Sequence, residues 1–368
     1  MMMITKTIHA DRKRHDLRRS ASFQSLAAVL TAVLCACSTR VWAQQSLDTI
    51  TNSRGIGEKG MIVQTSPTEL TMSAAGKEKQ YALDDVRDFY FGDEPAEMRR
   101  ARGQIKDNQV ELALEELERI DASTISRELV KEELEFLIAH TRGRIALSSG
   151  RELGTAVKSV RDFVTAHRNS AHYFACIDQL GQLAAASGRF DVAERFYDEL
   201  GKVPWTAQKL RADVLRADAR RLQGANKLAQ AKELYDNVIG SREPGEEAEL
   251  QRNLAIAGKA ICEAQLGQPQ AGIDAVQALI ERNDPQNTHL FAHAYNALGA
   301  CELAAGRKVD ALLAYLHVHI LFYQDRETHA EALYYIQQLF QDEGFADRAQ
   351  QIRNLLKESY PSSYWAQK

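Results

Sequence analysis

One sequence pattern recurs from about residue 96 to residue 368, and it constrains the fold of this chain more than any other feature. In residues 177–200 a Leu-Gly pair is followed by a glycine, an alanine, and a tyrosine four residues after that alanine. Residues 295–318 repeat this order, and partial copies lie before, between and after the two. Such a chain is expected to form an array of similar units, each of which contacts mainly its neighbours.

The apolar residues within a copy have the spacing of a helix. Ala193, Tyr197 and Leu200 are separated by four and three residues, so in an α-helix they share one face. Gly188 precedes them and marks a turn from an earlier helix. A single hairpin of two helices cannot bury such a face, whereas stacked hairpins bury it against one another. The sequence therefore predicts an all-α superhelical solenoid of helical hairpins over residues 96–368.

The unit resembles the tetratricopeptide repeat, which consists of two antiparallel helices in about 34 residues. The resemblance covers about three quarters of the chain and implies about six or seven hairpins. It also implies that small residues let helices approach closely while tyrosines fill the space between hairpins. The small residues are Gly181, Ala231 and Gly299, and the tyrosines are Tyr197, Tyr235 and Tyr315. No copy matches the full consensus, since Ile177 or Tyr295 stands where the family has tryptophan.

The first 43 residues have the organisation of a signal peptide. Residues 1–24 are basic and polar, and Ser25–Cys37 is a mostly apolar run, shorter than the roughly 20 residues needed to span a membrane. Val41-Trp42-Ala43 then provides a cleavage site. We therefore expect residues 1–43 to be removed, and the mature chain, without a membrane span, to lie in the periplasm or cell envelope of a bacterium.

The same segment permits a second processing route. Leu34-Cys35-Ala36-Cys37 is similar to the motif of bacterial lipoproteins, in which a cysteine after a small residue is lipidated. Lipidation would leave Cys37 at the mature N-terminus and anchor the protein to a membrane surface. The sequence is therefore compatible with both a free and a lipid-anchored form.

Residues 44–95 have a different pattern, in which apolar and polar residues alternate. Met61 with Val63, and Leu70 with Met72, are separated by single residues. This alternation predicts a small β-rich segment of three or four short strands, whose apolar face is covered by the adjoining helices. A disordered linker is the alternative.

This segment contains a GxGxxG motif at Gly55-Ile56-Gly57-Glu58-Lys59-Gly60. A dinucleotide-binding loop with this spacing follows a strand and opens a helix, so that the pyrophosphate meets the helix N-terminus. Here the glycines precede Met61-Ile62-Val63, which are strand residues. We therefore expect no nucleotide cofactor at this motif.

The charge of the body argues against nucleic acid as a partner. The whole chain has a net charge of −4, but residues 44–368 carry 39 basic and 48 acidic side chains, a balance of about −9. Such a surface lacks the basic face that neutralises phosphates.

Few residues have the arrangement that catalysis or metal binding requires. His289 and His293 lie four apart on a predicted helix and could contact one metal ion, but no third ligand stands beside them in the sequence. The chain has no GxSxG motif and no phosphate-binding loop. The cysteines after residue 43 occupy helical apolar positions typical of small core residues, and they are Cys176, Cys262 and Cys301. We therefore expect no enzymatic activity, no cofactor and no bound metal.

The family resemblance implies a function in protein binding. In such arrays the first helix of each hairpin lines a concave groove, and its polar residues contact partner proteins. The expected groove residues are Asp178, Gln182, Arg216, Arg220, His293, Asn296, Tyr334 and Gln338. The sequence thus favours a non-catalytic interaction scaffold of the envelope or periplasm over a lipid-anchored structural component, and both over a hydrolase or metalloenzyme.

Overall fold

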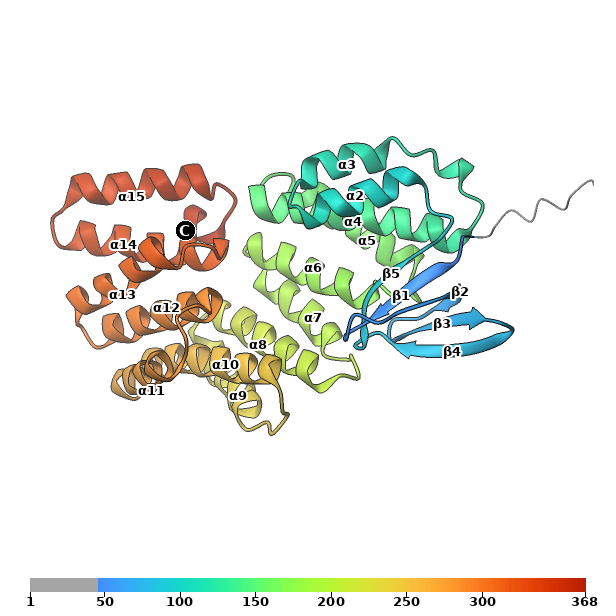
Figure 1. The fold of residues 1–368 in the computed structure, drawn as a ribbon. Coiled ribbons are helices and arrows are strands. Elements are labelled where there is room, and N and C mark those ends of the chain that lie inside the picture. The colour runs from blue at the N-terminus through green and yellow to red at the C-terminus, as the bar shows by residue number, and fades with distance from the viewer. Residues whose placement is uncertain (1–45) are drawn as a thin grey trace, which may run out of the picture. The chain divides into compact units, whose positions relative to one another are not determined.

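The computed structural model describes residues 46–368, so the predicted signal peptide and Cys37 lie outside the described residues. Residues 47–368 form one compact unit. This unit begins with a small antiparallel sheet and continues with helices to its end (Figure 1). The predicted helical repeats and the predicted β segment before them are both confirmed.

The sheet has five strands in the order β4-β3-β2-β1-β5, and each neighbouring pair is antiparallel. The strands are β1 (Asp48–Asn52), β2 (Gly57–Thr65), β3 (Glu69–Ala74), β4 (Lys77–Ala82) and β5 (Val86–Tyr90). The sequence predicted three or four strands, so the alternation undercounted them. A disordered linker is excluded for this segment.

The buried face of the sheet follows the predicted alternation in β3 but not in β2. Leu70 and Met72 are almost fully buried. Val63, which the alternation placed with them, is instead 46% exposed, while its neighbour Ile62 is 1% exposed. The pairing of β2 with β3 shifts between Ile62 and Gln64, so Val63 is the extra residue of a β-bulge. Met61, which precedes the bulge, is also only partly buried, whereas Gly60 and Ile62 are buried, so β2 faces the core with the opposite set of residues from the predicted one.

The GxGxxG motif belongs to the sheet and opens no helix. Gly55 lies between β1 and β2 with φ of +81°, a conformation that glycine adopts without steric cost. Gly60 lies in β2, where an added Cβ would come within 2.7 Å of Met72 Cγ. The turn and the close strand packing account for these two glycines.

Within the described residues, fourteen helices pair consecutively into seven hairpins (Figure 1). The hairpins are α2 (Ala96–Lys106) with α3 (Val110–Glu118), α4 (Glu128–Ser149) with α5 (Leu153–Ala166), α6 (Tyr173–Ala186) with α7 (Phe190–Leu200), α8 (Thr206–Leu222) with α9 (Leu228–Ile239), α10 (Glu246–Gln265) with α11 (Pro269–Arg282), α12 (Thr288–Ala304) with α13 (Lys308–Leu321), and α14 (Arg326–Asp342) with α15 (Ala346–Ser359). A short helix, α16 (Tyr364–Gln367), follows the last hairpin.

A tyrosine packed on a helical glycine holds several of these helices together. Tyr315 of α13 is fully buried, and a Cβ added to Gly299 of α12 would lie 2.7 Å from its ring. Tyr197 and Gly181 make the same contact between α7 and α6. The expectation that tyrosines fill the space between hairpins therefore needs refinement, because these two tyrosines pack within their own hairpin.

The hairpin of α8 and α9 uses a variant of this contact. Ala219 stands sixteen residues before Tyr235, at the position that Gly181 and Gly299 have relative to their tyrosines. Tyr235 instead lies against Gly258 of α10, in the next hairpin, and donates a hydrogen bond to Asp218 Oδ1 at 2.5 Å. The tyrosine at this position of the repeat can thus pack either within its own hairpin or against the next hairpin.

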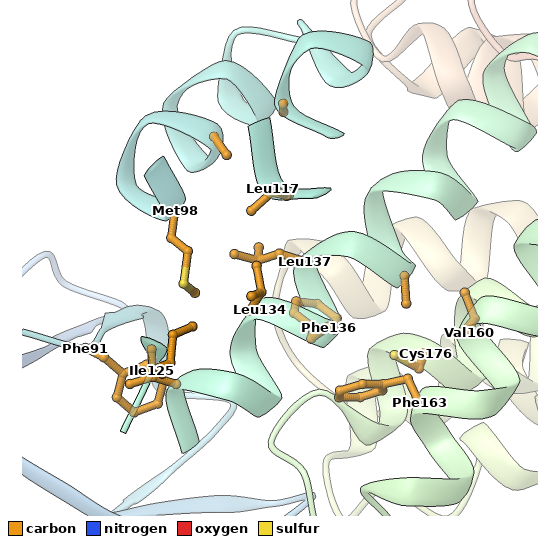
Figure 2. Close-up of a cluster of buried hydrophobic side chains, with 14 of the residues drawn as sticks. Phe91, Met98, Leu117, Ile125, Leu134, Phe136, Leu137, Val160, Phe163 and Cys176 are labelled. Carbon is orange, nitrogen blue, oxygen red and sulfur yellow. The ribbon is translucent and has the colours of Figure 1, made fainter. Parts of the chain in front are cut away.

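The core continues without a break from the sheet into the first hairpins. Figure 2 shows Phe91, which follows β5, together with Met98 of α2, Leu117 of α3 and Leu134 of α4. The same cluster extends to Phe163 of α5. Burial of these shared apolar surfaces makes the sheet a cap on the first end of the array.

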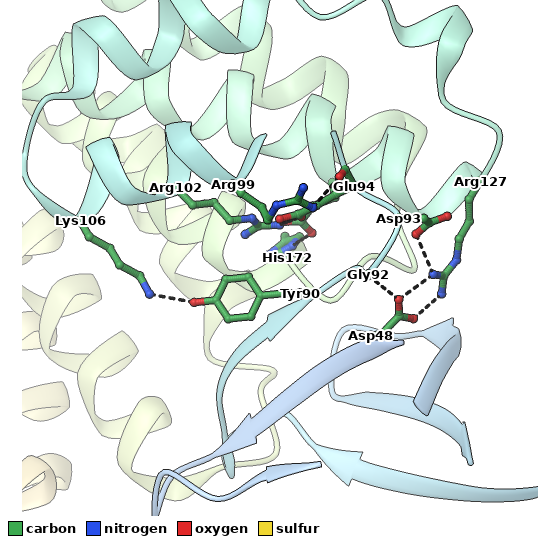
Figure 3. A network of polar contacts seen from close by, with 11 residues as sticks. Asp48, Tyr90, Gly92, Asp93, Glu94, Arg99, Arg102, Lys106, Arg127 and His172 are labelled. Atoms are coloured by element: carbon green, nitrogen blue, oxygen red, sulfur yellow. Dashed lines mark hydrogen bonds and ion pairs between the residues drawn. The ribbon is translucent and has the colours of Figure 1, made fainter. Parts of the chain in front are cut away.

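A buried ion pair also fixes the sheet to the helices (Figure 3). Asp48 of β1 is fully buried, and its carboxylate accepts hydrogen bonds from Arg127 Nη1 at 2.9 Å and Nη2 at 2.7 Å. The same carboxylate accepts from the backbone N–H groups of Ile62 and Gly92. Because all of these donors converge on one carboxylate, the ion pair is compensated within the core.

A second buried network lies between α2, α4 and the start of α6. Glu133 Oε1 lies 2.7 Å from Arg102 Nη2, and Glu133 Oε2 lies 2.7 Å from His172 Nε2. Glu94 shares the same arginine, at 3.3 Å. Burial alone raises the pKa of Glu133, but the charges of His172 and Arg102 outweigh it and lower that pKa to about 2.

The packing predicts the outcome of adding one methyl group at Gly299. Gly299→Ala forces the new Cβ against the Tyr315 ring, so the free energy of unfolding should fall by about 1–3 kcal/mol. Gly154 of α5 is the matched control, because nothing lies within 4 Å of its added Cβ. Gly154→Ala should raise stability by up to about 1 kcal/mol. Urea unfolding measures the free energy of unfolding of both variants. Equal changes in the two variants would contradict the close contact between Gly299 and the Tyr315 ring.

Glu133 predicts a loss of stability in acid. Its folded-state pKa is depressed, so its contribution is complete above the ordinary value of 4.5 and is lost as the pH falls toward about 2. Glu133→Gln should cost on the order of 3 kcal/mol at neutral pH and should flatten the acid limb of the unfolding free energy. The exposed pair of Lys158 and Asp162 provides the control, since Asp162→Asn should change stability by less than about 1 kcal/mol. An unchanged acid limb in Glu133→Gln would refute this assignment.

Candidate binding cavity

A cavity of about 440 Å³ lies where the first helices of successive hairpins face one another. Helices α4, α6, α8, α10, α12 and α14 all contribute to its lining, whereas only Tyr197 comes from a second helix. The lining residues are Leu147, Gln182, Ala185, Ala186, Tyr197, Arg211, Val214, Leu215, Asp218, Gln251, Leu254, His289, His293 and 325–328. The cavity is therefore built from residues of six different hairpins.

Helical periodicity selects which side chains reach the cavity. On α8 the lining residues are Arg211, Val214, Leu215 and Asp218, which follow one face at intervals of three, one and three residues. Val214 and Leu215 supply apolar surface, and Asp218 supplies a carboxylate. The resulting mixture of apolar walls and a few polar groups is typical of a ligand-binding site.

The C-terminal segment joins the last hairpin to the second and third hairpins. The Ser362 hydroxyl donates to the carbonyl oxygen of Gly150, 212 residues earlier in the chain. The rings of Tyr364 and Phe190 are 5.0 Å apart in an edge-to-face arrangement. Trp365 is almost fully buried beside α14. These contacts hold the last hairpin near the end of α4 and the start of α7, and so bring first helices that are distant in the sequence around one cavity.

Two histidines and an aspartate meet at one wall of this cavity. His289 and His293 are one turn apart on α12, and Asp325 directly precedes α14. The ligand atoms of the three side chains all lie within 4.8 Å of one another, and His289 Nδ1 is 3.4 Å from Asp325 Oδ2. Two imidazoles and a carboxylate form a donor set that can bind a metal ion. The two histidines were predicted as possible ligands from the sequence, but the aspartate was not.

Burial and neighbouring charges control the titration of this cluster. Burial, reinforced by the charge of His289, lowers the pKa of His293, which favours its neutral form. Burial opposes ionisation of Asp325, but its contacts with His289, His293 and Thr328 hold its pKa well below the ordinary range. Burial raises the pKa of the adjacent Glu327. At neutral pH the cluster therefore combines a carboxylate with a neutral imidazole.

Three of the eight predicted groove residues lie at a cavity. Gln182 and His293 line the cavity described above. Asp178 lines a second pocket of about 580 Å³ beside β5, and its Oδ2 lies 2.8 Å from Arg211 Nη1. Whether these residues bind a partner stays a prediction.

The other five predicted residues have partners elsewhere in the chain. Arg216 and Arg220 point toward α7, where they pair with Asp198 at 3.0 Å and with Glu194. They lie on a different face of α8 from its cavity-lining residues. Asn296 is 3% exposed and donates to the carbonyl oxygen of Thr328 at 2.8 Å, so its side chain is engaged inside the array.

Tyr334 and Gln338 lie on α14 beside the C-terminal segment. The Tyr334 hydroxyl accepts a hydrogen bond from Gln338 Nε2 at 2.6 Å. Its ring lies 5.5 Å from the Trp365 ring and 5.1 Å from Lys368 Nζ. The C-terminal residues of the chain thus cover part of the face that the sequence assigned to a partner.

Several cavity residues were missed by sequence reasoning, among them Arg211, Asp218, Gln251 and Asp325. One signal could have found the aspartate. Asp325 precedes α14 as Asn287 precedes α12, and each side chain accepts a hydrogen bond at the start of its helix. Residues at equivalent positions of adjacent repeats lie side by side. The residue that precedes the first helix of the next hairpin, Asp325, could therefore have been predicted to lie near His289.

No protein-family model matches the sequence, and no curated protein matches it. Among solved structures, the crystal structure of a tetratricopeptide repeat protein from Parabacteroides merdae ATCC 43184 is similar, with a TM-score of 0.51 and 16% sequence identity. The similarity covers 72% of this chain and 96% of that chain. The fold is that of a tetratricopeptide repeat protein. The tetratricopeptide hairpins account for the placement of first helices around the cavity.

Two further solved structures are similar at lower TM-scores. A Rap protein complexed with competence and sporulation factor gives 0.46 with 13% identity, over 73% of this chain and 76% of that chain. PilW, a type IV pilus biogenesis factor, gives 0.37 with 17% identity, over 62% and 97%. At these TM-scores neither structure supports a conclusion about this chain.

No helix between residues 46 and 368 of this tetratricopeptide fold is both long and apolar enough to cross a membrane.

Proposed function

We propose that this chain is a non-catalytic scaffold that binds a short segment of a partner protein in the cavity between its first helices. The observation that carries the proposal is the lining, to which six hairpins contribute both apolar and polar side chains. A volume of about 440 Å³ falls within the range of roughly 300–1,000 Å³ found for small-ligand sites. It accommodates a few side chains of a partner but no folded domain.

The cysteines support a role without covalent chemistry. Cys176, Cys262 and Cys301 are all buried. Burial raises the pKa of these thiols to about 12, 11 and 12 respectively. A buried thiol in its neutral form is a poor nucleophile, so these residues serve as small core residues.

The location proposed for this scaffold is the bacterial periplasm or envelope. The support is the N-terminal sequence, with its basic start, short apolar run and Val41-Trp42-Ala43. A lipid-anchored envelope component is the second candidate, and the Leu34-Cys35-Ala36-Cys37 motif favours it.

Blocking the cavity should abolish partner binding. Leu215 lines the cavity, and Leu215→Trp fills part of its volume. Leu313 of α13 is 52% exposed on a second helix, so Leu313→Trp is the matched control. Affinity capture from an envelope extract should recover a reproducible partner with the parent chain and with Leu313→Trp but lose it with Leu215→Trp. Recovery with both tryptophan variants would exclude the cavity as the binding site.

The double variant Arg216→Ala/Arg220→Ala separates the cavity from the groove predicted by the sequence. Both arginines face α7 and neither lines the cavity, so the partner should be retained. Loss of the partner in a variant that still folds would place the binding surface on that side of α8.

The mass of the mature N-terminus should distinguish the two processing routes. Cleavage after Ala43 gives an unmodified chain that begins at Gln44, which is the result we expect. An acylated chain that begins at Cys37 would instead establish the lipid-anchored component. Intact-mass spectrometry of the protein purified from a bacterial host, without added tags at that end, measures the difference.

A further inference from the structure

We propose that His289, His293 and Asp325 bind a divalent transition-metal ion, with zinc as the best fit, at the wall of the cavity. No bound metal was expected from the sequence, in which only two candidate ligands, His289 and His293, stand close together. The third ligand is contributed by the next hairpin, so the site forms only when two hairpins stack.

The distances among the ligand atoms suit a single small ion. His289 Nδ1 and Asp325 Oδ2 are 3.4 Å apart. Two ligands of a tetrahedral zinc ion lie about 3.3 Å apart when each bond is about 2.0 Å long. All three ligand atoms lie within 4.8 Å of one another, and the His289 and His293 rings are 4.8 Å apart. Modest side-chain rotations on α12 therefore bring the three atoms to one centre.

Hydrogen bonds already orient the carboxylate. Asp325 Oδ1 accepts the backbone N–H of Thr328 at 2.9 Å and so caps the N-terminus of α14. This bond leaves Oδ2 directed toward His289. The Thr328 hydroxyl lies 3.4 Å from His293 Nε2. Partners of this kind hold metal ligands in place before the ion binds.

The cationic side chains that line the cavity are paired elsewhere. Arg326 donates to the carbonyl oxygen of Ser359 at 2.9 Å and stacks on Tyr360. Arg211 pairs with Asp178 at 2.8 Å. Neither arginine therefore takes the place of a metal ion beside Asp325.

The N-termini of α12 and α14 carry partial positive charge, which opposes a cation. The three protein ligands also leave at least one position of a tetrahedral ion to water or to a bound group. We therefore expect weaker binding than at a closed site with four protein ligands. Since the cluster lines the cavity, the open coordination position is accessible to a group that enters the cavity.

Metal binding is measured without any partner protein. The result therefore tests the metal site independently of the proposed function.

Zinc titration of the purified mature chain, stripped of metal beforehand, tests the site. Isothermal titration calorimetry should show one ion bound per chain, and zinc should raise the Tm because its ligands join two hairpins. Cobalt in place of zinc should give a visible absorption band typical of nitrogen and oxygen ligands. Absence of binding by the parent chain would overturn the proposal.

Variants separate this site from adventitious binding by surface histidines. Asp325→Asn keeps an N-cap oxygen for Thr328 but removes the anionic ligand, so the fold should survive. His289→Ala removes a partly exposed ligand. Each should weaken zinc binding by more than about tenfold and abolish the increase in Tm. His317→Ala, on the exposed face of α13, should leave both unchanged. Equal affinities in all four proteins would assign the binding to other histidines.

Discussion

The close approach of a tyrosine ring to a helical glycine is the contact on which the array depends. At Gly299 and Gly181 the missing side chain is what allows Tyr315 and Tyr197 to lie between two helices. Two helices that approach so closely bury more apolar surface, and the tyrosine fills the space with a large, rigid side chain. The geometry of each hairpin then sets how the next one stacks.

The same contact connects the core to the cavity. Tyr235 lies against Gly258 in the core and donates its hydroxyl hydrogen to Asp218, whose carboxylate lines the cavity. The packing that stabilises the array thus also orients a polar group at the site. At the other end of the chain, Ser362 and Tyr364 hold the last hairpin against earlier ones. Cavity and core are therefore two consequences of one stacking arrangement.

Two buried carboxylates lie in the first part of the structure, where the sheet meets the helices. Asp48 and Glu133 each receive several donors, from Arg127 in one case and from Arg102 and His172 in the other. Such networks contribute little net stability when they replace apolar contacts, but they are costly to break. They fix how the sheet caps the array, which apolar contacts alone would specify less precisely.

Periodicity determined the class of fold in advance. Helical spacing, recurring glycines and the tyrosines at Tyr197, Tyr235 and Tyr315 were sufficient to predict stacked hairpins, and alternation was sufficient to predict the sheet. The bulge at Val63 was not predictable in this way, because one extra residue shifts the register without changing the composition of the strand.

The candidate site depended much more on tertiary structure. The sequence identified Gln182 and the histidine pair, but it could not place Asp325 beside His289, because that contact crosses between hairpins. It also assigned Arg216 and Arg220 to the groove, since local spacing does not fix the rotation of a helix against its neighbours. The sequence by itself therefore determined a repeating helical array, which depends on local periodicity. Only the tertiary structure decided which faces enclose the cavity, because that depends on how helices far apart in the chain pack together.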